Sequence, residues 1–161
     1  MNDKRAQIFT ADFFVAISIF FLLIIIVMIN WNIYYDKIDE RKDYSDMTNK
    51  AFQISNYLVK ADGFPDDWNS SDVKIIGLAD SDRVLSSDKI NLLIDTPLNK
   101  TTDIFKTYKY NFSIIIVDID GIVLHNYGYS KNNPKKSVSI RRYVNYNNEE
   151  SILELNLWNE K

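Results

Sequence analysis

Few residues in this sequence are able to perform catalytic chemistry. His125 is the only histidine and the chain has no cysteine, so neither a catalytic triad nor a thiolate zinc site can be completed. A single histidine in a predicted strand is typical of a packed or surface residue. Glycine is also too scarce for a phosphate-binding loop. We therefore expect no enzymatic activity and no cofactor.

Two pairs of aspartates have a spacing found in calcium-binding loops. Asp118 and Asp120 precede Gly121, but Tyr129 stands at the twelfth position, where such a loop needs glutamate. We interpret this pair as part of a hairpin turn, since Asp-Gly is a strong hairpin signal. Asp80 and Asp82 form the second pair, which we interpret as solvated turn residues. We expect no metal site.

Asp12 carries a carboxylate at the start of an apolar run. From Phe13 to Ile29 every residue except Ser18 is apolar, and an aspartate toward the membrane centre costs about 2.5–3.5 kcal/mol. Asp12 could lie at the inner headgroup level and stay solvated. Alternatively, a peptidase that cuts after the small residue Ala6 would leave a free ammonium on Gln7. Asp12 could pair with that ammonium, which would offset its desolvation.

The apolar run is long enough to cross a membrane. Counted from Ile8 it spans about 22 residues, and ~30 Å of hydrocarbon needs about 20 in a helix. Lys4 and Arg5 precede it, which favours a cytoplasmic N-terminus and an outer C-terminal part. A secretory signal would have a shorter core and a small-residue cleavage site after it. Here the bulky sequence NWNIYY follows, so we expect the run to be retained.

The sequence Lys4-Arg5-Ala6-Gln7, followed by Asp12 and the apolar run, resembles the prepilin leader of archaeal type IV pilin-like proteins. The resemblance implies that a prepilin peptidase cuts the Ala6–Gln7 bond and that Asp12 pairs with the new amine during assembly. Two departures are visible. The commonest residue before the cut is glycine, and the usual acid is a glutamate five residues into the mature chain, whereas Asp12 is the sixth from Gln7.

The elements around these residues begin with a long helix, expected from about Ile8 to Lys60, on the order of 80 Å long. No proline or glycine interrupts residues 8–62. Two helical stripes follow the apolar run: Trp31, Tyr34, Tyr35 and Ile38, then Tyr44, Met47, Ala51, Ile54 and Leu58. The first stripe suits a membrane–water interface or contacts between helices in a filament. The second suits packing on a domain, with a partner helix as the alternative.

Beyond the helix, the pattern predicts a small α+β domain. Gly63-Phe64-Pro65 should end the helix. This turn, Trp68 and the sequence Ile-Gly-Leu-Ala at 76–79 also look similar to the pilin-like family. We expect a strand over 73–78, a helix over 87–94 with Ser86 as its N-cap, and a helix over 102–108. Further strands are expected over 111–119, 122–127, 137–146 and 151–158, as an antiparallel meander with one buried face.

The predicted fold class is therefore α+β: a long N-terminal helix, membrane-spanning in its first half, packed on a small antiparallel sheet, as in type IV pilins. The predicted organisation is a leader (1–6), an apolar transmembrane and assembly helix (7–30), an extracytoplasmic helix half (31–62) and a head (63–161). Three Asn-x-Ser/Thr sequons, at Asn69, Asn99 and Asn111, make N-glycosylation plausible if the head is outside the cell. Asn99 is expected in a loop, and Asn111 is expected to be the least accessible.

The function expected from these features is structural. The chain would be a pilin-like subunit of an archaeal type IV pilus-type filament or assembly machine, held in the cytoplasmic membrane with its head outside. Its partners would be membrane lipid, prepilin peptidase and like or related pilin subunits. A net charge of −3 argues against nucleic acid. The alternative is an uncleaved single-span protein that presents a binding or adhesin domain.

Overall fold

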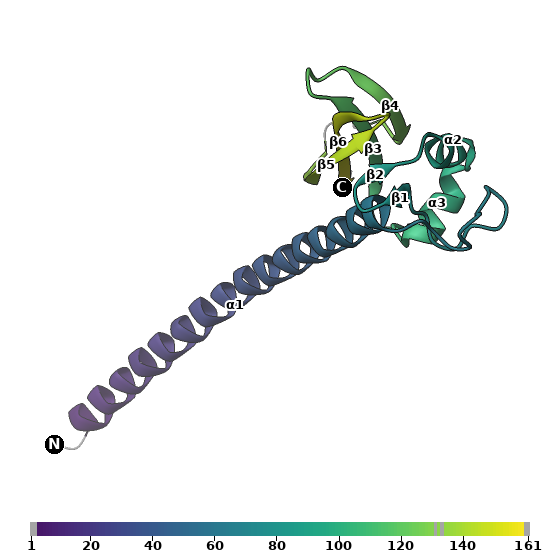
Figure 1. Cartoon of the computed structure of the whole chain (residues 1–161). Coiled ribbons are helices and arrows are strands. Elements are labelled where there is room, and N and C mark those ends of the chain that lie inside the picture. The colour runs from purple at the N-terminus through teal and green to yellow at the C-terminus, as the bar shows by residue number, and fades with distance from the viewer. Residues whose placement is uncertain (1–2, 131, 133, 160–161) are drawn as a thin grey trace. The chain divides into compact units, whose positions relative to one another are not determined.

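The computed structural model describes residues 3–130, 132 and 134–159, with side chains from Asp12 onward except at 36, 39 and 40. The chain divides into two compact units, Met1–Asp43 and Tyr44–Lys161. We call the second the head unit. The described part of the first unit is entirely helical, while the head unit contains helices and a sheet (Figure 1). The expected mixture of helix and mainly antiparallel sheet is confirmed at this level.

Helix α1 covers Asp3–Lys60, a length of 58 residues. Its end at Lys60 agrees with the prediction, but it starts five residues before the expected Ile8. The sequence Asp-Lys-Arg-Ala-Gln at 3–7 contains no helix breaker and several good helix formers, which explains the earlier start.

The segment after α1 corrects the prediction of a strand over 73–78. Only an isolated bridge between Phe64 and Ile75 forms there. The amide of Leu78 donates to the Leu58 carbonyl at 3.0 Å, and that of Ala79 donates to the Ala61 carbonyl at 3.3 Å. Because the last carbonyls of a helix lack partners within it, this segment satisfies the end of α1 instead of extending a sheet.

Two short helices lie in the head unit. α2 covers Ser87–Asp95, close to the expected 87–94, although Ser86 at its N-cap position makes no side-chain capping bond. α3 covers Leu98–Phe105, not 102–108. Pro97 is its N-cap residue, where the missing amide costs no helical hydrogen bond, and Lys106 ends it with φ of 53°. The prediction found this helix but placed it four residues too late.

The sheet has six strands in the order β1-β2-β5-β6-β3-β4. Their bounds are β1 Ala79–Ser81, β2 Val84–Leu85, β3 Asn111–Asp118, β4 Val123–Gly128, β5 Lys136–Tyr146 and β6 Glu149–Asn159. The predicted meander is wrong, because β6 lies between β5 and β3. The predicted strands do pair antiparallel, and the one parallel pair joins β2 to β5.

The burial of β6 and β4 agrees with their places in the sheet. Six of the 11 residues of β6 are buried, whereas Tyr127 is the one buried residue of β4. β6 has a neighbouring strand along both edges and β4 along one, which accounts for the difference. The segment between Gly128 and Lys136 connects the edge strand β4 to β5 on the other side of β6.

The head unit has one core, built on one face of the sheet. Cross-strand register aligns Phe112 with Leu157 and Ile114 with Leu155, and Val138 also pairs with Leu157. The helical stripe joins the same cluster: Met47, Ala51, Ile54 and Leu58 are all at most 4% exposed. Tyr44, the first residue of that stripe, is 51% exposed. Packing of the stripe on the domain is therefore confirmed for four of its five residues.

Arg142 is a cation on the core face of the sheet. It pairs across β5 and β6 with Leu153 and donates to Asn56 Oδ1 at 3.0 Å and Ser55 Oγ at 3.2 Å, both on α1. Its guanidinium lies 4.7 Å from the centre of the Phe52 ring. Arg142 thus links the sheet to residues 52–56 of α1 through hydrogen bonds and a cation–π contact.

Replacing Arg142 with leucine should lower the free energy of unfolding of the head by about 1–3 kcal/mol, because charge-assisted hydrogen bonds and the cation–π contact are lost. Unfolding of the full chain in detergent by urea, followed by tryptophan fluorescence, measures this change. Arg141→Leu is the matched control. Arg141 is exposed on the opposite face and donates to Glu154 at 2.7 Å, so its loss should change stability by less than about 1 kcal/mol. Equal effects of the two variants would contradict the assignment.

Candidate functional site

The most prominent surface feature of the chain is the apolar part of α1. Asp12–Tyr35 is 24 residues long and contains an 18-residue window with a mean hydropathy of 3.0, none of which is buried in the structure. The core helix of a soluble protein would be mostly buried, so this segment differs from one. Its length and composition allow it to cross a membrane, although an N-terminal signal sequence meets the same criterion.

The polar side chains within this segment differ in whether they have a hydrogen-bond partner. Ser18 Oγ donates to the Phe14 carbonyl at 2.7 Å, and Asn30 Nδ2 donates to the Ile26 carbonyl at 2.8 Å. Both side chains therefore find a partner on their own helix, as is common in apolar surroundings. Asp12 is exposed and makes no hydrogen bond or ion pair with any described residue. It is the one charged residue in the sequence of this segment.

Ala6 and Gln7, the residues of the predicted cleavage site, lie in α1, but their side chains are outside the described set. Gln7 and Asp12 are five residues apart, which corresponds to a rise of about 7.5 Å along the helix. Cleavage and pairing are not tested by the structure and stay predictions.

The first helical stripe is exposed, as a surface that contacts lipid or other subunits requires. Trp31 is 61%, Tyr34 69% and Tyr35 54% exposed. The Trp31 and Tyr35 rings lie 5.8 Å apart, centre to centre. Their place at the end of the apolar segment suits an interfacial aromatic belt, which stays a prediction.

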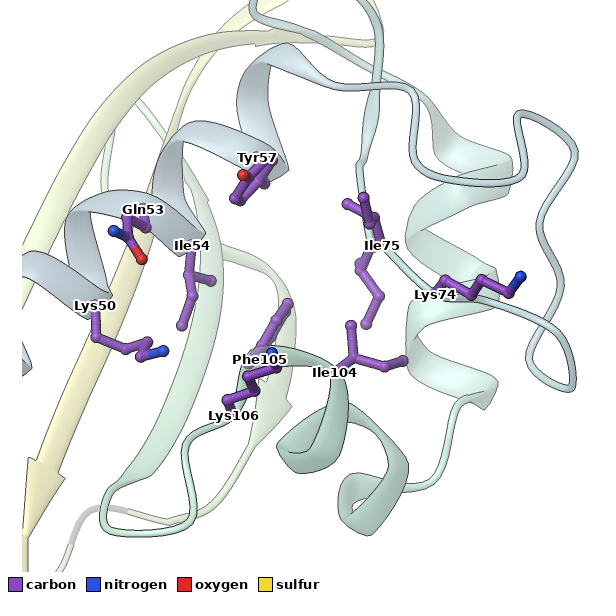
Figure 2. Close-up of a pocket in the computed structure, with 10 residues that line it drawn as sticks. Lys50, Gln53, Ile54, Tyr57, Lys74, Ile75, Ile104, Phe105 and Lys106 are labelled. Carbon is purple, nitrogen blue, oxygen red and sulfur yellow. The ribbon is translucent and has the colours of Figure 1, made fainter.

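A cleft in the head unit was not predicted from the sequence. It has a volume of about 280 Å³ and lies between α1, α3 and the segment at 74–76 (Figure 2). Ile54, Ile104 and Phe105 form part of its apolar lining. Figure 2 shows the Lys50 side chain reaching from α1 toward α3, where Lys106 lies. Neither lysine forms an ion pair with a described residue, so the cleft combines an apolar lining with two uncompensated cations.

The cleft continues into a second hollow of about 360 Å³, which shares Lys50, Gln53 and Lys106 with it and adds Lys109. At the other end, Lys74 lies 5.6 Å from the centre of the Phe64 ring. Asp46 is the one carboxylate among the described residues that line the two hollows. Only the fold brings these lysines together, since they are spread over about 60 residues of sequence.

The three sequons are placed differently from one another. Asn69 and Asn99 are exposed, and Asn111 is half-buried at the start of β3. Asn111 is thus the least accessible, as predicted, but Asn99 lies in the first turn of α3 and not in a loop. Asn69 accepts a hydrogen bond from the Ser71 amide at 2.8 Å within its own sequon. Glycosylation itself is not tested by the structure.

The acidic pairs and the histidine have structural contacts. Asp118 Oδ1 accepts a hydrogen bond from the Ile122 amide at 2.8 Å, which holds the β3–β4 turn, so the hairpin interpretation is confirmed. Asp80 lies 3.3 Å from Lys89 Nζ. His125 is half-buried, with its Nε2 2.8 Å from Tyr146 Oη. Among the described residues, no group of three or more His, Asp or Glu side chains is arranged to hold a metal ion.

Comparison with family models, curated proteins and solved structures gives no match to this chain. Its functional interpretation therefore depends on the residues and surfaces described above.

Proposed function

We propose that this chain is a structural, pilin-like subunit of an archaeal type IV pilus-type filament or of a related assembly machine. Its head lies outside the cytoplasmic membrane and its apolar N-terminal helix is first a membrane anchor and then the polymerisation element. The observation that supports this most strongly is the bare apolar segment of α1. None of Asp12–Tyr35 is buried by the chain itself, so lipid or another protein must cover it.

Assembly by this route is driven by packing of the apolar helices. Extraction from the membrane would expose the segment, and neighbouring helices in a filament would bury it again. At about 25 cal/mol per Å² of apolar surface, burial of some twenty large side chains supplies tens of kcal/mol in gross terms. This exceeds what one carboxylate–ammonium pair contributes. Packing therefore provides the driving force, while Asp12 sets the register between neighbouring subunits.

In this proposal, removal of the leader creates the ammonium group that pairs with Asp12. Prepilin peptidase would cut between Ala6 and Gln7, and the new ammonium would pair with Asp12 of the same or a neighbouring subunit. Asp12 is exposed, so its carboxylate is accessible to such a partner. A carboxylate without a partner is costly in a helix bundle, so pairing favours the register in which the two charges meet.

A second function is favoured by the cleft in the head unit. An uncleaved, single-span protein could use that cleft to bind a ligand at the cell surface. The two functions differ in what the apolar segment does, because in the second it stays in lipid and no polymer forms.

Electron microscopy of cells with and without the chain tests the proposal. Immunogold labelling directed at the head should decorate surface filaments, and deletion of the chain should remove or shorten them. Cells that keep unlabelled filaments of normal number and length, with the chain confined to the membrane, would favour the second function.

A further inference from the structure

The tip of the β3–β4 hairpin presents apolar side chains to solvent. Ile119 is 69% and Ile122 is 63% exposed. They are the two most exposed aliphatic side chains among the described residues of the head unit. Isolated exposed apolar residues are common on protein surfaces, whereas two at one turn, next to Val123 at 56% exposure, indicate a contact site.

The hairpin tip is held in one conformation by its own hydrogen bonds. The amide of Asp118 donates to the Ile122 carbonyl at 3.0 Å, and the Ile122 amide donates back to the Asp118 carboxylate at 2.8 Å. Gly121, with φ of 85°, supplies the left-handed residue that the turn needs. A binding element that is already ordered loses little conformational entropy when it binds.

Asp120 lies at this tip between Ile119 and Gly121. It is exposed and has no hydrogen-bond or ion-pair partner among the described residues. The tip is therefore an apolar surface that carries an uncompensated negative charge. The cleft between α1 and α3 has the opposite character, since Lys50 and Lys106 stand uncompensated beside Ile54, Ile104 and Phe105.

We propose that the hairpin tip of one copy of this chain docks into the lysine-bearing cleft of the next copy. Ile119 and Ile122 would contact the apolar lining, and Asp120 would pair with Lys106 or Lys50. This inference rests on the proposed function, since it names the contact between heads of polymerised subunits. Charge complementarity is the feature that selects a second copy as the occupant.

The geometry of this contact allows many copies to link head to tail. The tip comprises residues 118–123, while the cleft is lined by residues 50–57, 74–76 and 104–106, so the two surfaces share no residue. One copy can donate its tip and receive another tip at the same time. Such a head-to-tail contact forms rings or helical filaments rather than closed two-fold dimers. The contact is small beside the buried helices and serves mainly to orient neighbouring heads.

The absence of cysteine from the chain permits a direct test. Full-length chains carrying either Ile119→Cys or Gln53→Cys are given different tags, expressed together in membranes and treated with a short bis-maleimide. Gln53 is exposed and lines the cleft. The mixed pair should cross-link, and a chain that carries both substitutions should give a ladder of dimers, trimers and longer species. Asp88→Cys, exposed on α2, replaces Gln53→Cys in the control.

Charge reversal in the doubly substituted chain then tests the ion pair. Lys106→Glu should reduce the ladder about tenfold, because like charges across an interface cost at least ~1.4 kcal/mol. Adding Asp120→Lys to the same chain should restore it. The contact is refuted if Ile119→Cys reacts with Gln53→Cys no faster than with Asp88→Cys, or if it reacts chiefly with itself.

The result also separates the two proposals. Filaments on cells together with no specific cross-link would refute this contact and leave the proposed function standing. A specific ladder in a cell that forms no filaments would support the contact and refute a role in a surface filament.

Discussion

Replacing Asp12 with alanine should abolish filament assembly while the chain still inserts in the membrane and its head still folds. Asp12 lies in the unit formed by Met1–Asp43, and the buried core of the head is built from residues after that unit. Insertion should become easier, because a carboxylate costs about 2.5–3.5 kcal/mol toward the membrane centre. Assembly should fail because the new ammonium at the mature N-terminus would then be buried without a partner, which is strongly unfavourable.

The measurement counts surface filaments per cell by electron microscopy and compares the amount of membrane-bound chain by immunoblot. Ser18→Ala is the matched control, since it removes a polar group of the same segment whose hydroxyl is already satisfied by the Phe14 carbonyl. That variant should assemble normally. Normal filaments from Asp12→Ala would show that Asp12 is only a solvated residue at the headgroup level.

Replacing Phe112 with alanine should destabilise the head by about 3–5 kcal/mol, the range for a buried phenylalanine. Phe112 is fully buried in β3. Its ring meets three aromatic rings, those of Phe105 at 5.5 Å, Tyr129 at 5.8 Å and Tyr127 at 6.2 Å between centres. The loss would leave a cavity between α3 and the sheet, because Phe105 of α3 packs on the Phe112 ring.

Urea unfolding of the full chain in detergent, followed by tryptophan fluorescence, measures the loss. Trp68 and Trp158 are both at most 2% exposed, so both report on the fold of the head. Tyr143→Ala removes an aromatic side chain that is 75% exposed and should change stability by less than about 0.5 kcal/mol. A loss below about 1 kcal/mol for Phe112→Ala would contradict the core described for this unit.

Periodicity in the sequence was sufficient to predict the elements whose apolar residues face one core. The stripe from Met47 to Leu58 follows from a period of 3.6, and the strands over 137–146 and 151–158 follow from a period of 2. Strand order was not predictable in this way. Alternation shows which face of a strand is buried but not which strand is its neighbour, so it could not place β6 between β5 and β3.

The segment 73–78 shows another limit of local pattern. Its apolar sequence fits a strand, yet the Leu78 amide at its end donates to the Leu58 carbonyl in the last turn of α1. The close approach requires Gly77, because a Cβ there would overlap the Ala61 carbonyl.

The candidate sites differ in how far the sequence predicts them. Asp12 stood out in the sequence because a charge in an apolar run is costly. The cleft did not stand out, since Lys50 and Lys106 are far apart in the sequence and line one cleft only in the folded head unit.

The mass of the mature chain tests most directly whether the apolar segment is kept and used for assembly. Intact-mass measurement of protein taken from sheared surface filaments should give a chain that begins at Gln7 and retains the whole apolar run. A chain recovered only as a soluble product that has lost residues 7–30 would contradict a polymer held together by that helix.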